Sequence, residues 1–198
     1  MNNLTHELKT PISTIGLACE ALNDPDMRTN KDIMTHYTGL IMEENKRLAV
    51  LVENVLQASV ADSGQMRLYP QSLNVHELIK KAVSNVAIQV RKSGGKIALD
   101  LTAVNPVCSV DPIHFTNVVY NLLDNALKYG GDHPVIRISS RVDEKGIALR
   151  FQDNGIGIAK EHLGKVFDRM YRVPTGNVHD VKGFGIGLSY VKNVIEGH

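Results

Sequence analysis

The sequence predicts a helical hairpin followed by an α+β two-layer sandwich, in which helices cover one face of a mixed sheet. Residues 1–65 carry two apolar patterns of helical period, separated by a proline-containing break. From residue 66 to residue 198, short runs typical of strands alternate with helical patterns that have capping residues. The composition, 43% hydrophobic and 22% charged, is ordinary for a globular protein. We therefore expect two domains, 1–65 and 66–198.

The first predicted helix covers residues 1–23, and its apolar residues recur at alternating steps of four and three. They are Leu4, Leu8, Ile12, Ile15, Cys19 and Leu22. His6 lies about 200° around the helix from Leu4 and from Leu8, so we expect its ring to face solvent. Thr10 shares that face, and Pro11 predicts a bend one turn after His6. An exposed imidazole next to the carboxylate of Glu7 indicates a nucleophile, although a lone exposed histidine is usually an ordinary surface residue.

The second predicted helix runs from about residue 30 to residue 61, and its apolar residues keep a heptad-like spacing that is interrupted at Glu44. They are Met34, Tyr37, Ile41, Leu48, Leu51, Val55 and Ala58. Two helices alone bury too little apolar surface to be stable. We therefore expect the hairpin to pair with a second copy of itself as a homodimeric four-helix bundle. Packing of the hairpin against the second half of its own chain is the open alternative.

Local signals delimit the elements of the second half. Asn74, with Glu77 three residues later, resembles a capping box and predicts a helix that ends near residue 92. Asp111 and Pro112 predict the N-cap and first position of a helix that runs to Tyr129. The other predicted elements are strands 66–73, 96–103 and 107–110, a hairpin of 135–142 and 147–152, a short helix 161–167, an irregular segment 173–182 and a last helix from Gly187.

Charge and composition disfavour several classes of protein. The net charge of +1 gives no indication of a nucleic acid or a membrane surface as partner. Cys19 and Cys108 form no CxxC pattern, which fits a reducing, cytoplasmic setting. The eight histidines show no HExxH or paired Cys/His metal spacing, and the sequence has no run of about 18 apolar residues that could span a bilayer.

A polar face marks the predicted helix that ends at Tyr129. Its members fall at steps of four and three and are Asn117, Asn121, Asn125, Lys128 and Tyr129. Asparagine is a poor residue for a helix interior, so three on one face suggest a function. Amide oxygens suit a hard cation such as Mg²⁺, lysine suits phosphate, and tyrosine can stack on a base. A polar network satisfied within the protein is the alternative.

Two glycine-rich stretches complete the pattern. Asp153-Asn154-Gly155-Ile156-Gly157 directly follows a predicted strand, and its glycines would let the backbone approach a ligand closely. An ordinary tight turn would explain it equally well. The second stretch, 183–188, has glycine at every other position and opens the last helix, where backbone N–H groups can bind anions. Neither stretch matches a Rossmann or a Walker phosphate motif.

In this order the three stretches resemble the N, G1 and G2 boxes of the Bergerat-type ATP-binding fold. Residues 167–172, Phe-Asp-Arg-Met-Tyr-Arg, resemble the F box that histidine kinases carry before the ATP lid. His6-Glu7-Leu8-Lys9-Thr10-Pro11 resembles their phospho-acceptor box. The resemblance to sensor histidine kinases of two-component systems covers essentially all of the chain. Relatives continue through further glycines and strands, so we expect a C-terminally truncated ATP-binding domain that lacks its last strands.

The resemblance implies roles for the residues that match it, with ATP and Mg²⁺ as cofactors. Asn125 would coordinate Mg²⁺ with support from Asn121, Lys128 would contact phosphate, and Tyr129 would lie against the adenine. Asp153 would read the adenine amino group. The other implied nucleotide-binding residues are Gly155 and Gly157 in the adenine pocket, Gly183, Gly185, Gly187 and Leu188 at the phosphates, and Arg172 as a further phosphate contact. The segment 173–182 would be the lid.

The resemblance also favours a kinase over a hydrolase. Hydrolytic members of the fold carry a glutamate four residues before the metal-binding asparagine, and here that position is Asn121, whose amide is not a general base. His6 would therefore accept the γ-phosphoryl group, with Glu7 orienting its ring. An aspartate of a response regulator would receive the phosphoryl group next, and Thr10 would align water for dephosphorylation of that partner. A catalytically silent dimeric scaffold, which a missing sheet edge would favour, and a nucleotide hydrolase are the alternatives.

Overall fold

The computed structural model describes residues 2–25, 30–62, 66–144, 146–173 and 185–198. The chain divides into two compact units, Met1–Asp62 and Ser63–His198. Together they have the predicted fold class, a helical hairpin and an α+β two-layer unit, which is confirmed.

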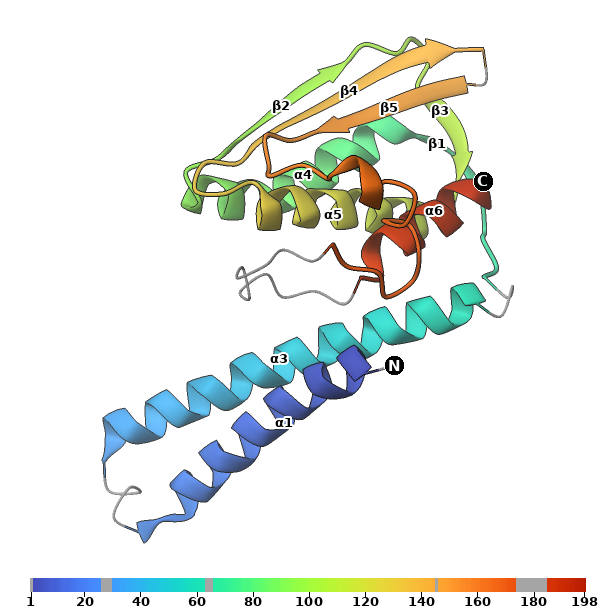
Figure 1. Ribbon diagram of the computed structural model, residues 1–198. Coiled ribbons are helices and arrows are strands. Elements are labelled where there is room, and N and C mark those ends of the chain that lie inside the picture. Colours follow the sequence, from blue (N-terminus) through green and yellow to red (C-terminus); the bar gives the residue numbers. More distant parts are fainter. Residues whose placement is uncertain (1, 26–29, 63–65, 145, 174–184) are drawn as a thin grey trace. The chain divides into compact units, whose positions relative to one another are not determined.

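The first unit is an antiparallel pair of helices, α1 (Asn2–Asn23) and α3 (Lys31–Asp62) (Figure 1). Asn30 caps α3, because its Oδ1 accepts hydrogen bonds from the N–H groups of Asp32 and Ile33 at 3.0 and 3.2 Å. α1 continues as a helix through Pro11. The motif that resembles a phospho-acceptor box, residues 6–11, lies within this helix. The predicted helix boundaries are therefore confirmed within one residue.

The buried face of α1 differs from the predicted apolar stripe. Pro11 and Ala18 of α1 and Leu51 of α3 are buried, and the two helices pack on one another. Ile12 and Leu17, in contrast, are 57% and 67% exposed in the single chain. The predicted stripe placed Ile12 and Cys19 on the packed face, but both are exposed, and the buried residues Pro11 and Ala18 lie one position before them. The hairpin thus retains apolar side chains that α3 does not cover.

The second unit contains two sheets. β2 (Lys96–Leu101) pairs in parallel with β4 (Val135–Asp143), which pairs antiparallel with β5 (Gly146–Gln152). β1 (Gln71–Asn74) and β3 (Val107–Val110) form a separate antiparallel pair. Helices α4 (Val75–Lys92) and α5 (Pro112–Tyr129) lie along one face of the β2-β4-β5 sheet (Figure 1). The core between helices and sheet includes Val75, Ile79, Ala82, Val119, Leu123, Ile136 and Ile138.

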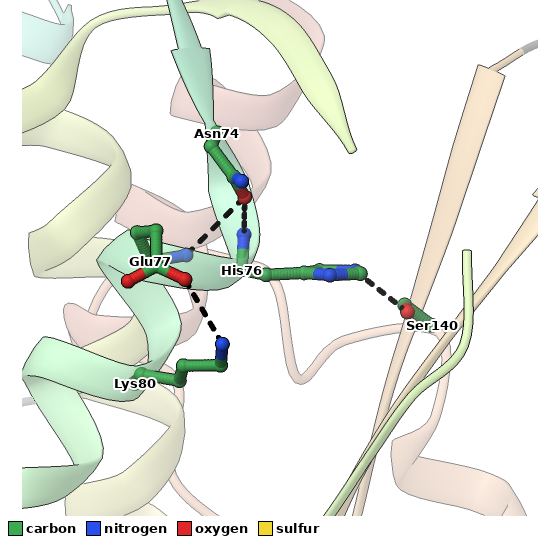
Figure 2. Close-up of polar contacts among 5 residues, drawn as sticks. All are labelled: Asn74, His76, Glu77, Lys80 and Ser140. Atoms are coloured by element: carbon green, nitrogen blue, oxygen red, sulfur yellow. Dashed lines mark hydrogen bonds and ion pairs between the residues drawn. The ribbon is translucent and has the colours of Figure 1, made fainter. Parts of the chain in front are cut away.

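The start of α4 is held by side chains (Figure 2). Asn74 Oδ1 accepts hydrogen bonds from the N–H groups of His76 and Glu77 at 3.0 and 3.4 Å, which confirms the predicted cap. The Glu77 carboxylate bonds Lys80 at 2.9 Å. The buried ring of His76 meets Ser140 Oγ of β4 at 2.8 Å and so joins helix to sheet.

The start of α5 is the second capped junction. Asp111 Oδ1 accepts hydrogen bonds from the N–H groups of Ile113 and His114, at 2.9 and 3.0 Å, as the sequence predicts. Burial raises the pKa of Asp111, but the hydrogen bonds from backbone N–H groups outweigh it and the pKa lies below its usual value. The N–H group of Asp111 donates to His198 Nε2 at 2.8 Å, which fastens the end of the chain to this cap.

Three predicted elements are shorter in the structure. The strand predicted at 96–103 ends at Leu101. The strand predicted at 66–73 begins only at Gln71, because its partner β3 ends opposite, at Val110, where Asp111 turns to cap α5. The N–H group of Tyr69 donates to Asp111 Oδ2 at 2.9 Å instead of to a strand. The helix predicted at 161–167 is a single 3₁₀ turn, Lys160–His162, followed by further turns.

Candidate functional site

Two segments of the second unit that are far apart in sequence meet α5, which makes three segments in contact. They are the C-terminal half of α5, the segment 153–157 after β5, and the start of α6 (Gly187–Glu196). α6 packs on α5 through a small apolar cluster that includes Val118, Tyr190 and Val194. The N–H group of Ile156 donates to the carbonyl of Tyr129, the last residue of α5, at 3.2 Å. The structure therefore brings the predicted N, G1 and G2 stretches together.

The polar face of α5 is accessible. Asn117, Asn121, Asn125 and Tyr129 are half-buried and Lys128 is exposed. Asn121 Nδ2 donates to the carbonyl of Asn117 at 2.9 Å, so its amide oxygen turns toward α6. Lys128 forms an ion pair with Asp124 one turn earlier, and a phosphate group would have to compete with this carboxylate.

The segment after β5 is a hydrogen-bonded turn. Asp153 Oδ1 accepts a hydrogen bond from the N–H group of Gly155 at 2.8 Å, while the carboxylate remains exposed. Gly155 lies so close to α5 that a Cβ atom there would stand 2.6 Å from the carbonyl oxygen of Tyr129. Gly157 has open space around it but a φ of +71°, which favours glycine. The first glycine is thus required for close approach and the second for backbone conformation.

The start of α6 is equally tight. A Cβ atom on Gly187 would stand 2.7 Å from Asn121 Oδ1, and one on Gly185 would stand 2.6 Å from the carbonyl oxygen of Tyr171. Leu188 and Arg172 are half-buried. Gly183 and residues 174–182 of the predicted lid lie outside the described residues.

Two residues of this region were not predicted from the sequence. Asn154 bonds backbone groups on either side of Pro134, and His162 Nδ1 lies 2.7 Å from the hydroxyl of Tyr171. Both contacts join segments whose proximity depends on the fold. Asn154 lies inside the glycine motif, and this position was the signal in the sequence that could have identified it. Nothing in the sequence marked His162.

The phospho-acceptor-like motif lies in the first unit, on α1. Thr10 is exposed and its carbonyl accepts a hydrogen bond from Thr14 Oγ1 at 3.0 Å. The side chains of His6 and Glu7 lie outside the part of the chain that the structure describes, so the solvent-facing orientation of His6 stays a prediction.

The residues present suit a nucleotide and a hard cation. Half-buried amide oxygens line the α5 face, and at Gly155 and Gly187 the absent Cβ atoms leave the two flanking segments close against it. Within the described ranges, no group of three His, Cys, Asp or Glu residues could hold a metal by itself. No helix among them is both long and apolar enough to cross a membrane.

Two protein-family models match the chain. Residues 1–64 match the His Kinase A (phospho-acceptor) domain, and residues 110–198 match the histidine kinase-, DNA gyrase B- and HSP90-like ATPase. Among curated proteins, the sensor protein RprX of Bacteroides fragilis (strain YCH46) is 48% identical over 200 residues, covering 100% of this chain and 38% of RprX. The chain thus spans little more than a third of the length of that relative.

Solved structures show the same fold. The histidine kinase AdeS of Acinetobacter baumannii aligns with a TM-score of 0.73 at 23% identity, covering 96% of this chain and 86% of that one. The histidine kinase ThkA, solved in complex with the response regulator protein TrrA, aligns with a TM-score of 0.69 at 22% identity, covering 98% of this chain and 52% of that one.

Proposed function

Because this chain belongs to the sensor histidine kinases of two-component systems, we propose that it phosphorylates itself on His6 with ATP and passes the phosphoryl group to an aspartate of a response regulator. The observation that carries this proposal is the convergence of three segments at α5, where Gly187 touches Asn121 and Gly155 touches Tyr129. In this proposal the three converging segments form the nucleotide-binding part of the kinase. The histidine motif on α1 supplies the acceptor.

Residues 66–198 form the ATP-binding catalytic domain in this proposal. Asn125, supported by Asn121, holds Mg²⁺ through its amide oxygen, and Lys128 exchanges Asp124 for a phosphate oxygen. Tyr129 and Asp153 bind the adenine, with Gly155 and Gly157 shaping their pocket. The phosphate-binding residues are Gly183, Gly185, Gly187, Leu188 and Arg172. Bound Mg²⁺ supplies neutralisation of the phosphate charge.

The chemistry needs little more than positioning. A neutral imidazole nitrogen of His6 forms a bond to the γ-phosphorus of ATP as the bond from that phosphorus to the ADP oxygen breaks. Glu7 orients the ring and accepts its second proton. Asn121 does not activate water, since an amide is not a general base. ATP is therefore kept for His6 instead of being hydrolysed.

Residues 1–65 form the dimerisation and histidine-phosphotransfer domain in this proposal. The apolar side chains that stay exposed on the hairpin support a homodimeric four-helix bundle, because a second hairpin would bury them. They are Ile12, Leu17, Met34, Met42 and Val52. The complex of ThkA with TrrA supports a response-regulator receiver domain as the partner. Thr10, exposed on α1, aligns water when the regulator is dephosphorylated.

Phosphorylation of the chain tests the proposal. We expect [γ-³²P]ATP with Mg²⁺ to label the protein in an acid-labile, alkali-stable form, because phosphohistidine has this stability. His6→Gln should abolish the label. His36→Gln, at an exposed histidine on α3, should retain it. Label that persists in His6→Gln would show that another residue is the acceptor, and an unlabelled chain that still binds ATP would indicate a silent scaffold. Since the reaction uses ATP, we place this part of the protein in the cytoplasm.

A further inference from the structure

Asn154 takes the place of a strand residue without belonging to the strand. The ladder between β4 and β5 ends at the pair Arg137 and Gln152. Continuing this register by two residues places Asn154 opposite Val135. There the Asn154 side chain makes the bonds that a strand backbone would make: Oδ1 accepts from the N–H group of Val135 at 2.8 Å, and Nδ2 donates to the carbonyl of His133 at 3.2 Å. The main chain is thereby released to turn toward α5.

The segment to which Asn154 binds is itself firmly packed. Pro134, between its two partners, is almost fully buried. The carbonyl of Pro134 accepts a hydrogen bond from the N–H group of Lys96, the first residue of β2, at 2.8 Å. Cβ atoms on Gly95 and Gly130 would stand 2.5 and 2.6 Å from Pro134 atoms, so both backbones press against this proline. Asn154 is therefore attached to a rigid support.

Asp153 lies between this attachment and the last residue of β5. Its Oδ1 is held by the N–H group of Gly155, and the next N–H group, of Ile156, is held by Tyr129. Asp153 Oδ2 has no hydrogen-bond partner in the part of the chain that the structure describes. Since the backbone is fixed on both sides, the direction of this second carboxylate oxygen is also fixed.

We propose that Asn154 is a positioning residue that aims the Asp153 carboxylate and so sets the preference of the site for adenine over guanine nucleotides. The inference rests on the proposed function, in which Asp153 reads the base. Adenine presents an amine that donates to a carboxylate, whereas guanine presents a carbonyl oxygen that a carboxylate repels. A carboxylate whose direction is not fixed would lose both the attraction to the adenine amine and the repulsion of the guanine carbonyl oxygen.

The test compares the dissociation constants of ATP and GTP, with Mg²⁺, for the full chain and for variants. Asn154→Ala removes both side-chain bonds, and we expect it to lower the ratio of ATP to GTP affinity about tenfold, as loss of one hydrogen bond to a charged group would. Asn154→Asp keeps the acceptor for Val135 but loses the donor to His133, so its ratio should be intermediate. If Asn154→Ala does not fold, Asn154→Asp decides the matter alone.

Asn85→Ala is the matched control, because Asn85 Nδ2 also makes a hydrogen bond between two elements, to the hydroxyl of Tyr120 at 2.6 Å. It should lower the melting temperature without changing the ratio. If the role of Asn154 were merely structural, its variants would bind ATP and GTP more weakly to the same extent. An unchanged ratio of ATP to GTP affinity in these variants would therefore overturn the inference, while the proposed function would stand. A wild-type chain that binds neither nucleotide would overturn both.

Discussion

Gly187 on α6 lies directly against the side-chain amide of Asn121 on α5, at a distance that leaves no room for a Cβ atom. Asn121 Nδ2 is bonded to the carbonyl of Asn117, which turns Oδ1 toward that glycine. This contact joins the helix that offers amide oxygens to the helix that offers backbone N–H groups. The two halves of the proposed phosphate and Mg²⁺ site therefore depend on one another.

Gly187→Ala should weaken ATP binding more than it weakens the fold. The new Cβ would stand 2.7 Å from Asn121 Oδ1, and this flexible amide can rotate away at little cost to stability. The rotation misplaces the group that supports the cation site, so we expect an ATP affinity about tenfold lower, the equivalent of one hydrogen bond to a charged group. Calorimetric titration measures the effect. Gly164→Ala, at a glycine with open space around it, should leave affinity unchanged.

Asn125→Ala should remove the dependence of ATP affinity on Mg²⁺. In our proposal the amide oxygen of Asn125 is the protein ligand of the cation, and alanine offers none. Titrations of ATP with Mg²⁺ and with EDTA should differ for the wild-type chain and coincide for the variant. Asn117→Ala, on the same face of α5, keeps the backbone carbonyl that holds Asn121 and should behave as wild type. A variant that retains the Mg²⁺ effect would place the cation elsewhere.

The stability of the second unit should fall as the pH drops below about 6.5. Burial lowers the pKa of His76, the nearby charge of Lys80 lowers it further, and Glu77 raises it by less. Ser140 Oγ accepts a hydrogen bond from the N–H group of Ala103 at 3.1 Å. Its own proton is therefore available for the neutral ring of His76, which lies 2.8 Å away (Figure 2). As the pH falls, the unfolded state therefore binds a proton before the folded state does.

Urea titrations at pH 7.5 and pH 5.5 measure this effect. The contribution of His76 is fully present above its ordinary pKa of 6.5 and is lost as the pH falls through the lower folded pKa. His76→Gln, which does not titrate, should reduce the difference between the two free energies of unfolding. His133→Gln, at an exposed histidine, should not. An identical pH dependence in His76→Gln and wild type would contradict the prediction.

Tyr171→Phe should lower both stability and ATP affinity. The Tyr171 hydroxyl lies 2.7 Å from His162 Nδ1, and the Tyr171 backbone is the surface against which Gly185 packs. Loss of one hydrogen bond costs about 1 kcal/mol, and a displaced Gly185 would disturb the start of α6. Tyr120→Phe removes the comparable bond to Asn85 and should cost similar stability with no loss of affinity. Equal ATP affinities in the two variants would show that the Tyr171 contact is only structural.

Leu17→Glu should convert the proposed dimer to a monomer in sedimentation experiments. Leu17 is 67% exposed in the single chain, so a charge there is harmless to one hairpin but would be buried unpaired between two. His36→Glu, at an exposed position of α3, introduces the same charge and should remain dimeric. A Leu17→Glu protein that sediments as a dimer would place the interface on another face.

Local signals in the sequence determined most of the elements and their boundaries. Asn74, Asp111 and Pro112 cap or begin their helices as predicted, because a cap is a contact among neighbours in the chain. Glycine-rich motifs and the histidine motif identified the family, since residue type and order suffice for that. The sequence also predicted an apolar stripe along α1.

Tertiary structure alone decided which parts of those elements meet. It buried Pro11 and Ala18 and left Ile12 exposed, because the packing of the two helices decides which side of α1 is covered. It made β1 begin only at Gln71, because the partner strand turns away at Asp111. It brought Gly187 to Asn121 and Asn154 to Val135, contacts between residues distant in the chain. Such contacts leave no periodicity or spacing in a single sequence, since they arise only when packed helices and paired strands fix their register.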